Sequence, residues 1–182
     1  EKFNGSVLLI DGLSLGGQIL LEILSQRGNI CEYAIVESAL VIPSKLTYAM
    51  IKPAFGSCYG LIRHKWFSKL QFKSLKIKQE LFDDYYKDTC GIAKHNMIAF
   101  LQANSLYSIK ESIEKCTAKV KVFVGERENA AMKKSAQIIN ENLKSSSLRV
   151  MRKMYHGEFS INYAADYKNK VLEIKILDVF KS

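Results

Sequence analysis

Residues that hold metal ions or build disulfide frameworks are few in this sequence and widely separated. The chain has four cysteines and three histidines, with no C-x-x-C pair: Cys31, Cys58, Cys90, Cys116, His64, His95 and His156. Zinc sites and small disulfide scaffolds both need such residues at short, regular spacings. We therefore expect no metal site, and reduced thiols of the kind found in cytoplasmic proteins.

Proline, glycine-rich tracts and long apolar runs are also scarce. Only 2 prolines and 10 glycines occur among 182 residues, while 48% of the chain is hydrophobic and 25% is charged. This is the composition of a globular protein with a core of its own, and it excludes a disordered or collagen-like chain. Apolar runs such as Val7-Leu8-Leu9-Ile10 are far shorter than the ~20 residues that cross a bilayer. We expect neither a transmembrane segment nor a secretory leader.

The charge is positive and uneven. The 27 Lys and Arg residues exceed the 18 Asp and Glu residues, which gives a formal net charge of +9. Six cations and no anion lie between Arg63 and Lys78. An anionic lipid surface or a nucleic acid is one hypothesis for this stretch. A solvated face on helices is the interpretation we favour, because no nucleic-acid-binding motif accompanies the cations.

Apolar stretches alternate between the patterns of buried strands and of amphipathic helices. Short continuous apolar runs predict strands buried on both faces of a parallel sheet, and apolar residues at helical spacing predict helices between them. The predicted strands are 6–10, 33–36, 120–124 and 147–154, and the predicted flanking helices are 18–27, 129–143 and 159–171. The sequence therefore predicts an α/β fold with a mostly parallel sheet.

The stretch between the second and third predicted strands is different, because it is rich in aromatic residues and has helical periodicity. We expect three parts: residues 1–42 as the first part of an α/β core, residues 43–117 as a helical cap insertion, and residues 118–182 as the rest of the core. The larger apolar residues of the insertion are expected in the core of the cap rather than in a pocket: Tyr48, Met50, Phe55, Tyr59, Trp66 and Phe67.

One short motif carries chemistry. Gly12-Leu13-Ser14-Leu15-Gly16 has the pattern G-x-S-x-G directly after a predicted strand and before a predicted helix. In this setting a sharp turn lifts the serine, and we expect Gly12 and Gly16 to provide the room that a Cβ would occupy. The helix N-terminus lies beneath Ser14, so the N–H of Leu15 is a candidate oxyanion donor.

A serine hydroxyl needs a base, and the base needs an orienting acid. His156 lies late in the chain after the last predicted strand, and Glu128 follows the third one. The other two histidines, His64 and His95, fall in the insertion, where a surface position is expected. Ser14, Glu128 and His156 are therefore the candidate nucleophile, acid and base, in an order that this architecture uses.

These motifs resemble the α/β-hydrolase family. The likeness is carried by Gly12-Leu13-Ser14-Leu15-Gly16-Gly17, by Val122-Phe123-Val124-Gly125-Glu126-Arg127-Glu128 and by Tyr155-His156-Gly157-Glu158-Phe159. It spans essentially the whole chain from the elbow strand onward. It implies a serine hydrolase with the three candidate residues above as its triad and with no cofactor. The family usually carries Asp at the acid position, so Glu126 and Glu37 stay open as alternatives to Glu128.

The resemblance also implies that something precedes the elbow strand. Only residues 1–5 come before that strand here, and the chain begins with Glu1, so we expect a truncated piece without the N-terminal strands and without the loop that gives the second oxyanion donor. The open strand edge predicts a homo-oligomer. We expect hydrolysis of an ester, thioester or related acyl bond of a small substrate, with a non-catalytic binding or assembly module as the alternative.

Overall fold

The computed structural model describes residues 5–179, and the side chains of residues 5–172. Four strands form a parallel sheet in the order β1-β2-β3-β4, so each strand pairs with the next along the chain: Val7–Leu13, Cys31–Glu37, Lys119–Gly125 and Ser146–Met151. The predicted α/β class and mostly parallel sheet are confirmed. Because all four strands run the same way, their carboxyl ends meet at one edge, where ligands of open α/β sheets bind.

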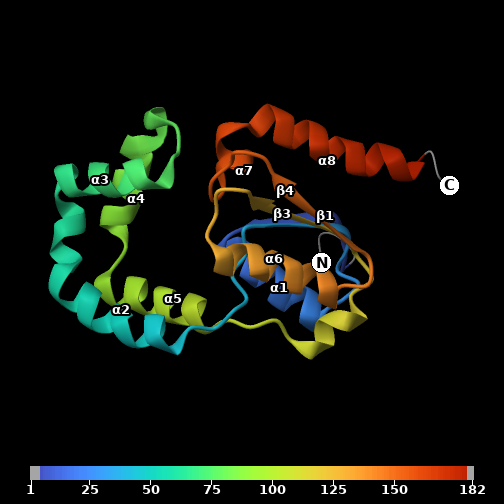
Figure 1. Cartoon of the computed structure of the whole chain (residues 1–182), viewed down its shortest axis with the longest axis horizontal. Helices are drawn as coiled ribbons and strands as arrows, with labels where there is room; N and C mark the ends of the chain where they lie inside the picture. The colour runs from blue at the N-terminus through green and yellow to red at the C-terminus, as the bar shows by residue number, and fades with distance from the viewer. Residues whose placement is uncertain (1–4, 180–182) are drawn as a thin grey trace.

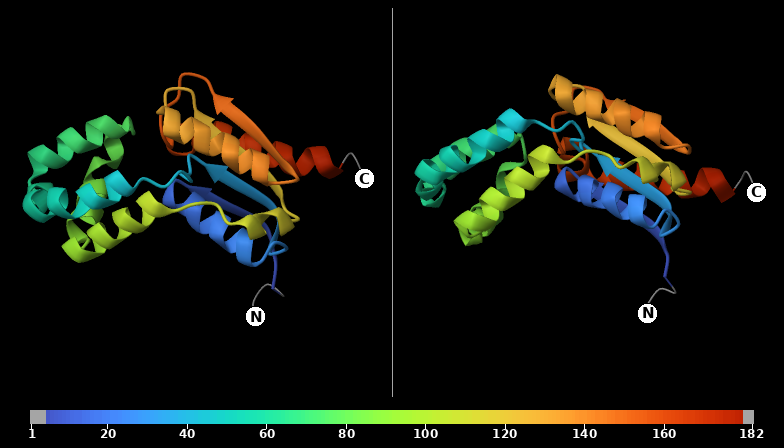
Figure 2. Two further views of the ribbon diagram at one scale, coloured as in Figure 1. Left: turned by 60° about the horizontal axis from the view of Figure 1, so that its bottom comes forward. Right: turned by 90° about the horizontal axis from the view of Figure 1, so that it is seen from below.

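Helices cover both faces of the sheet (Figures 1 and 2). On one face lie α1 (Leu15–Gln26) and α6 (Ala130–Asn142), packed on β1 and β2 and on β3 and β4, respectively. The main core fills this layer with aliphatic side chains from the strands and helices, among them Leu20, Leu24, Val36, Val122 and Ile139. Burial of these side chains is the main stabilising contribution here.

The other face of the sheet is covered by the last two helices. A smaller cluster of Ile35, Phe123 and Phe159 joins the sheet to α7 (Glu158–Asn162) and α8 (Ala164–Val179), with Phe123 and Phe159 edge to face at 5.5 Å. The single closing helix predicted at 159–171 is therefore wrong, because the chain breaks at Tyr163 between two helices. The last strand also ends earlier than predicted, at Met151, and leaves a loop before α7.

The segment between β2 and β3 forms helices to one side of the sheet (Figure 1). They are α2 (Lys45–Cys58), α3 (Lys65–Leu75), α4 (Phe82–Gly91) and α5 (Lys94–Leu106), with 3₁₀ turns Tyr59–Arg63, Gln79–Leu81 and Glu111–Lys115. Their own core consists of Ile51, Tyr59, Ile62, Phe72 and Phe82.

The predicted core of the helical segment is mostly wrong. Tyr59 is buried, whereas Tyr48, Met50 and Trp66 are exposed and Phe55 and Phe67 are half-buried. Helical periodicity identified the helices but not the side that each one buries, because these helices pack on one another more than on the sheet. Among the described residues, no helix has the length and apolarity that crossing a membrane requires.

Candidate active site

Ser14 occupies the sharp turn between β1 and α1. Its backbone has φ 55° and ψ −112°, a conformation that costs a non-glycine residue free energy and that persists only where the surroundings enforce it. Its N–H donates to the carbonyl of Glu37 at the end of β2, at 2.8 Å. The backbone hydrogen bonds of the sheet thus extend to Ser14 and hold it at the carboxyl edge. Leu15 begins α1 there, and its N–H has no acceptor inside the helix.

The glycines around the turn differ in what they permit. A Cβ at Gly12 would lie 2.4 Å from the carbonyl oxygen of Gly16, so only glycine fits there. A Cβ at Gly16 would have no heavy atom within 4 Å, apart from its chain neighbours and its own helix, so the room expected from Gly16 is not needed. Gly17, which the sequence motif included without a steric role, is tight as well, because its Cβ would lie 2.8 Å from that of Ala39.

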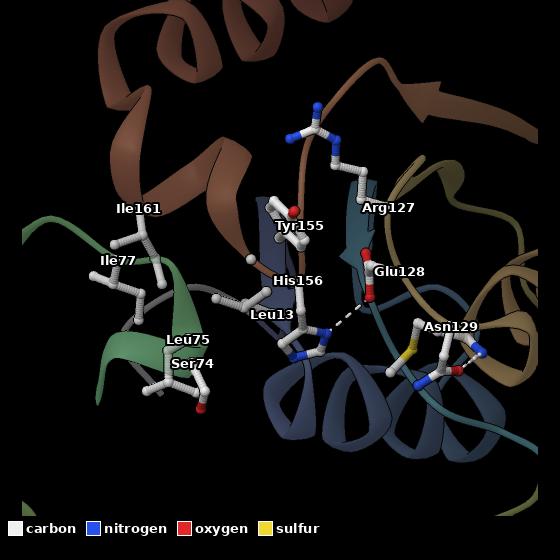
Figure 3. Close-up of a pocket in the computed structure, with 12 residues that line it drawn as sticks. Leu13, Ser74, Leu75, Ile77, Arg127, Glu128, Asn129, Tyr155, His156 and Ile161 are labelled. Atoms are coloured by element: carbon white, nitrogen blue, oxygen red, sulfur yellow. Dashed lines mark hydrogen bonds and ion pairs between the residues drawn. The ribbon is translucent and has the colours of Figure 1, made fainter. Parts of the chain in front are cut away.

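His156 and Glu128 meet at the same edge of the sheet. Nδ1 of His156 and Oε2 of Glu128 are 2.9 Å apart (Figure 3). The His156 side chain is 43% exposed while that of Glu128 is 2% exposed, so one end of the imidazole is anchored and the rest of the ring remains accessible.

The loop before His156 reaches Glu128 because Gly125 lets it approach. A Cβ at Gly125 would lie 2.4 Å from the carbonyl oxygen of Met154. That same carbonyl accepts a hydrogen bond from the N–H of Arg127 at 3.0 Å. The sequence analysis named Gly125 only as part of a motif, and its contact with a loop of much later sequence was missed.

Three donors converge on the carboxylate of Glu128. Oε1 accepts from the hydroxyl of Ser38 and from the N–H of Gly125, both at 2.7 Å, and Oε2 faces His156. Burial alone would raise the pKa of Glu128, but the hydrogen bonds from His156, Ser38 and Gly125 outweigh it and hold that pKa below its usual value. The ionised carboxylate only accepts, so Nδ1 of His156 carries the proton and Nε2 is left as the basic nitrogen.

The two alternative acids, Glu126 and Glu37, accept hydrogen bonds from backbone N–H groups and not from His156. Glu126 is exposed, and its Oε2 accepts from the N–H of Lys153 at 2.7 Å. Glu37 is buried behind the sheet edge and faces the N–H of Ser160 at 3.5 Å. Of the three carboxylates that the sequence offered, Glu128 is the one bonded to His156. The two other histidines, His64 and His95, are exposed in the helical segment, as expected.

A cavity of about 290 Å³ opens beside His156. Its lining comes from the elbow, the tip of the helical segment, and the loops after β3 and β4: Leu13, Ser74, Leu75, Ile77, Arg127, Glu128, Asn129, Met132, Tyr155, His156, Gly157 and Ile161 (Figure 3). The side chain of Leu13 lies within 3.2 Å of the position that a Cβ of Gly157 would take. Leu13 and Gly157, the chain neighbours of Ser14 and His156, therefore both lie at this cavity.

The tip of the helical segment is fastened over this cavity by Asn162. Its Nδ2 donates to the carbonyl of Lys76 at 2.8 Å, and its Oδ1 accepts from the N–H of Lys78 at 3.1 Å. One amide side chain thus holds the loop that carries Ile77 against α7. No group of three His, Cys, Asp or Glu side chains within the described residues is arranged to hold a metal ion.

Comparison with known proteins is informative only at the level of structure. No family model matches the chain, and no curated protein sequence matches it. Bromoperoxidase from Bacillus anthracis superposes with a TM-score of 0.75 at 13% identity, over 96% of this chain and 69% of that one. An esterase from Exiguobacterium antarcticum gives 0.71 at 18% identity, over 100% and 69%. The enol-lactonase from Burkholderia xenovorans LB400 gives 0.71 at 11% identity, over 93% and 65%.

These likenesses test the fold that the sequence motifs implied. The chain is covered almost completely, whereas it spans about two thirds of each of the three solved proteins. Identities this low carry information on fold and not on chemistry. The resemblance predicted from the sequence is confirmed at that level: the chain has a partial α/β-hydrolase fold.

Proposed function

We propose that the chain is the serine-hydrolase portion of an enzyme that cleaves an ester, thioester or related acyl bond of a small substrate. The observation that carries the proposal is the 2.9 Å contact between His156 and the buried Glu128, at the sheet edge where the backbone of Ser14 is strained. A strained serine on a strand-to-helix turn and a histidine fixed by an acid are the parts that acyl transfer needs.

In the proposed reaction, Oγ of Ser14 attacks the acyl carbon and its proton passes to Nε2 of His156. The N–H of Leu15 stabilises the negative charge that develops on the acyl oxygen. The imidazolium then protonates the departing alcohol or thiol, leaving an acyl ester on Ser14. A water molecule attacks this ester and gives its proton to His156, which returns it to Oγ as the carboxylic acid leaves. Glu128 remains ionised throughout and orients the ring.

The proposal is tested by labelling the serine. A fluorophosphonate probe should add one phosphonyl group to Ser14, detected by peptide mass spectrometry, and Ser14→Ala should abolish both labelling and the hydrolysis of 4-nitrophenyl butyrate. Ser25→Ala is the matched control, because Ser25 lies on α1 and bonds to the carbonyl of Leu21. Labelling that persists in Ser14→Ala, or its absence in wild type, would contradict the proposal.

A non-catalytic binding or assembly module is the second candidate. What favours it is that β1 is the edge strand of the described sheet and that the chain spans only about two thirds of its solved neighbours. A wild-type protein whose Ser14 is not labelled, but which still binds 4-nitrophenyl butyrate, would support this alternative. In either case we propose a cytoplasmic location, which rests on the small number and wide spacing of the cysteines in the sequence.

A further inference from the structure

Two cations share the ring of Tyr155, a residue that lines the cavity. The guanidinium carbon of Arg127 lies 5.3 Å from the centre of the Tyr155 ring, and Nζ of Lys76 lies 5.9 Å from it. Figure 3 shows Arg127 beside Tyr155, which adjoins His156. Both distances fall within the range of cation–π attraction, which holds the two positive charges near one another despite their repulsion.

The carboxylates next to Arg127 in the chain, and the one that follows Tyr155 most closely, bond to backbone groups or to His156. Oε2 of Glu126 accepts from the N–H of Lys153, and Oε2 of Glu158 accepts from the N–H of Tyr155, at 2.8 Å. Glu128 is engaged with His156. Within the described residues, neither cation is placed in an ion pair. Two positive charges without an anionic partner at the entrance of a cavity favour an anionic ligand.

One wall of the cavity is apolar. Leu13, Leu75, Ile77 and Ile161 form its wall next to His156. Arg127 directly precedes Glu128, and Tyr155, whose ring both cations face, directly precedes His156, so one cation and the shared ring adjoin the proposed acid and base in the chain. The site thus combines an apolar wall, the proposed acid and base, and two cations on the Tyr155 ring.

We propose that the substrate of this site is an acyl ester or thioester that carries a carboxylate a few bonds from its scissile acyl carbon. Arg127 and Lys76 bind the carboxylate beside Tyr155, while the methylene groups of the acyl chain lie against Leu75 and Ile77. Asn162 positions Lys76, because its side chain donates a hydrogen bond to the carbonyl of Lys76 and so fixes the loop that carries it. The inference rests on the proposed hydrolase function, and it adds a substrate class to it.

The first test compares two substrates that differ in charge and in one methyl group, the 4-nitrophenyl monoester of succinic acid and its methyl ester. The uncatalysed hydrolysis of each ester is subtracted. Wild type should prefer the anionic ester in kcat/KM by about tenfold at low salt, and the preference should shrink as salt is added. The double variant Arg127→Gln with Lys76→Gln should remove the preference. Lys73→Gln, which changes an exposed cation on α3, should keep it.

A second measurement does not depend on turnover. Succinanilic acid, an amide analogue with the same carboxylate, should bind the Ser14→Ala protein in calorimetry, and adding the two Gln substitutions should weaken binding about tenfold. Hydrolysis of both esters at equal rates, or a preference that survives in the double variant, would overturn the inference and leave the hydrolase proposal standing. Failure to cleave either ester would contradict the hydrolase proposal, and calorimetry would still decide whether the carboxylate binds.

Discussion

The hydroxyl of Ser38 donates to Oε1 of Glu128 over 2.7 Å, although the two residues are ninety positions apart in the chain. Ser38 follows β2 directly, is buried, and has a positive φ of 53°. Its own N–H donates to the carbonyl of Phe123 on β3, which fixes the residue in that conformation. The fold therefore uses a strained backbone to direct one hydroxyl at the carboxylate that holds His156.

Removing this hydroxyl should weaken both the site and the fold. Ser38→Ala leaves Oε1 of Glu128 with one donor fewer, so the pKa of Glu128 should rise and stability at neutral pH should fall by about 1–3 kcal/mol. A lowered carboxyl pKa stabilises the fold above the usual value and loses that effect as pH falls through the folded-state pKa. The difference between wild type and variant should therefore shrink toward low pH.

Ser38→Gly separates the hydrogen bond from the backbone strain. It lacks the hydroxyl as well, but glycine adopts a positive φ without a penalty, so it should be more stable than Ser38→Ala. Urea denaturation at several pH values measures both variants. Equal stability of wild type and Ser38→Ala at neutral pH would exclude the hydrogen bond as a stabilising contact.

Gly12 and Gly16 of the elbow give a second prediction. A methyl group added at Gly12 would clash with the backbone, whereas one added at Gly16 would meet no neighbour outside its helix. Gly12→Ala puts a methyl group against the carbonyl of Gly16 and should destabilise the protein by about 1–3 kcal/mol or prevent folding. Gly16→Ala meets no neighbour outside its helix and should stabilise it by about 0.5–1 kcal/mol, since alanine favours helices. Thermal denaturation compares the two, and a Gly16→Ala protein as unstable as Gly12→Ala would refute the steric account.

The sequence predicted those features of the site that depend only on residues close together in the chain. A strand followed by G-x-S-x-G and a helix is a steric arrangement within a few residues, so the strained turn at Ser14 could be anticipated. The roles of Ser38, Gly17 and Gly125 could not, because each depends on a residue brought near by tertiary packing. The exposed side of the helical segment, with Trp66 at 64% exposure, was missed for the same reason.

Glu37 should destabilise the protein in its charged form. Its side chain is only 3% exposed and its Oε2 has no hydrogen-bond partner. Burial raises its pKa, opposed by hydrogen bonds from Ser160 and reinforced by the charges of Asp11 and Glu128. A carboxyl whose pKa is raised in the folded state contributes stability below its unfolded pKa and loses it as pH rises through the folded value.

Glu37→Gln should therefore raise the melting temperature, and the gain should grow as pH increases from about 4 to 8. The amide oxygen can still accept from Ser160, so the substitution removes the charge with little change of shape. Glu32→Gln on the exposed side of β2 is the control and should show no such trend. A gain that is equal at all pH values would point to packing rather than charge.

The open edge of β1 should cause self-association. Among the described strands β1 pairs with β2 alone, and Leu8, the second residue of β1, is 49% exposed. An apolar strand edge with free N–H and C=O groups pairs readily with a second chain, whereas a lysine on it opposes such pairing. We therefore expect wild type to elute as a dimer or larger species in size-exclusion chromatography with light scattering, and Leu8→Lys to shift it toward monomer. Leu46→Lys, at a residue of α2 that is 76% exposed, should leave the oligomer intact. If wild type is monomeric at micromolar concentration, the edge does not associate.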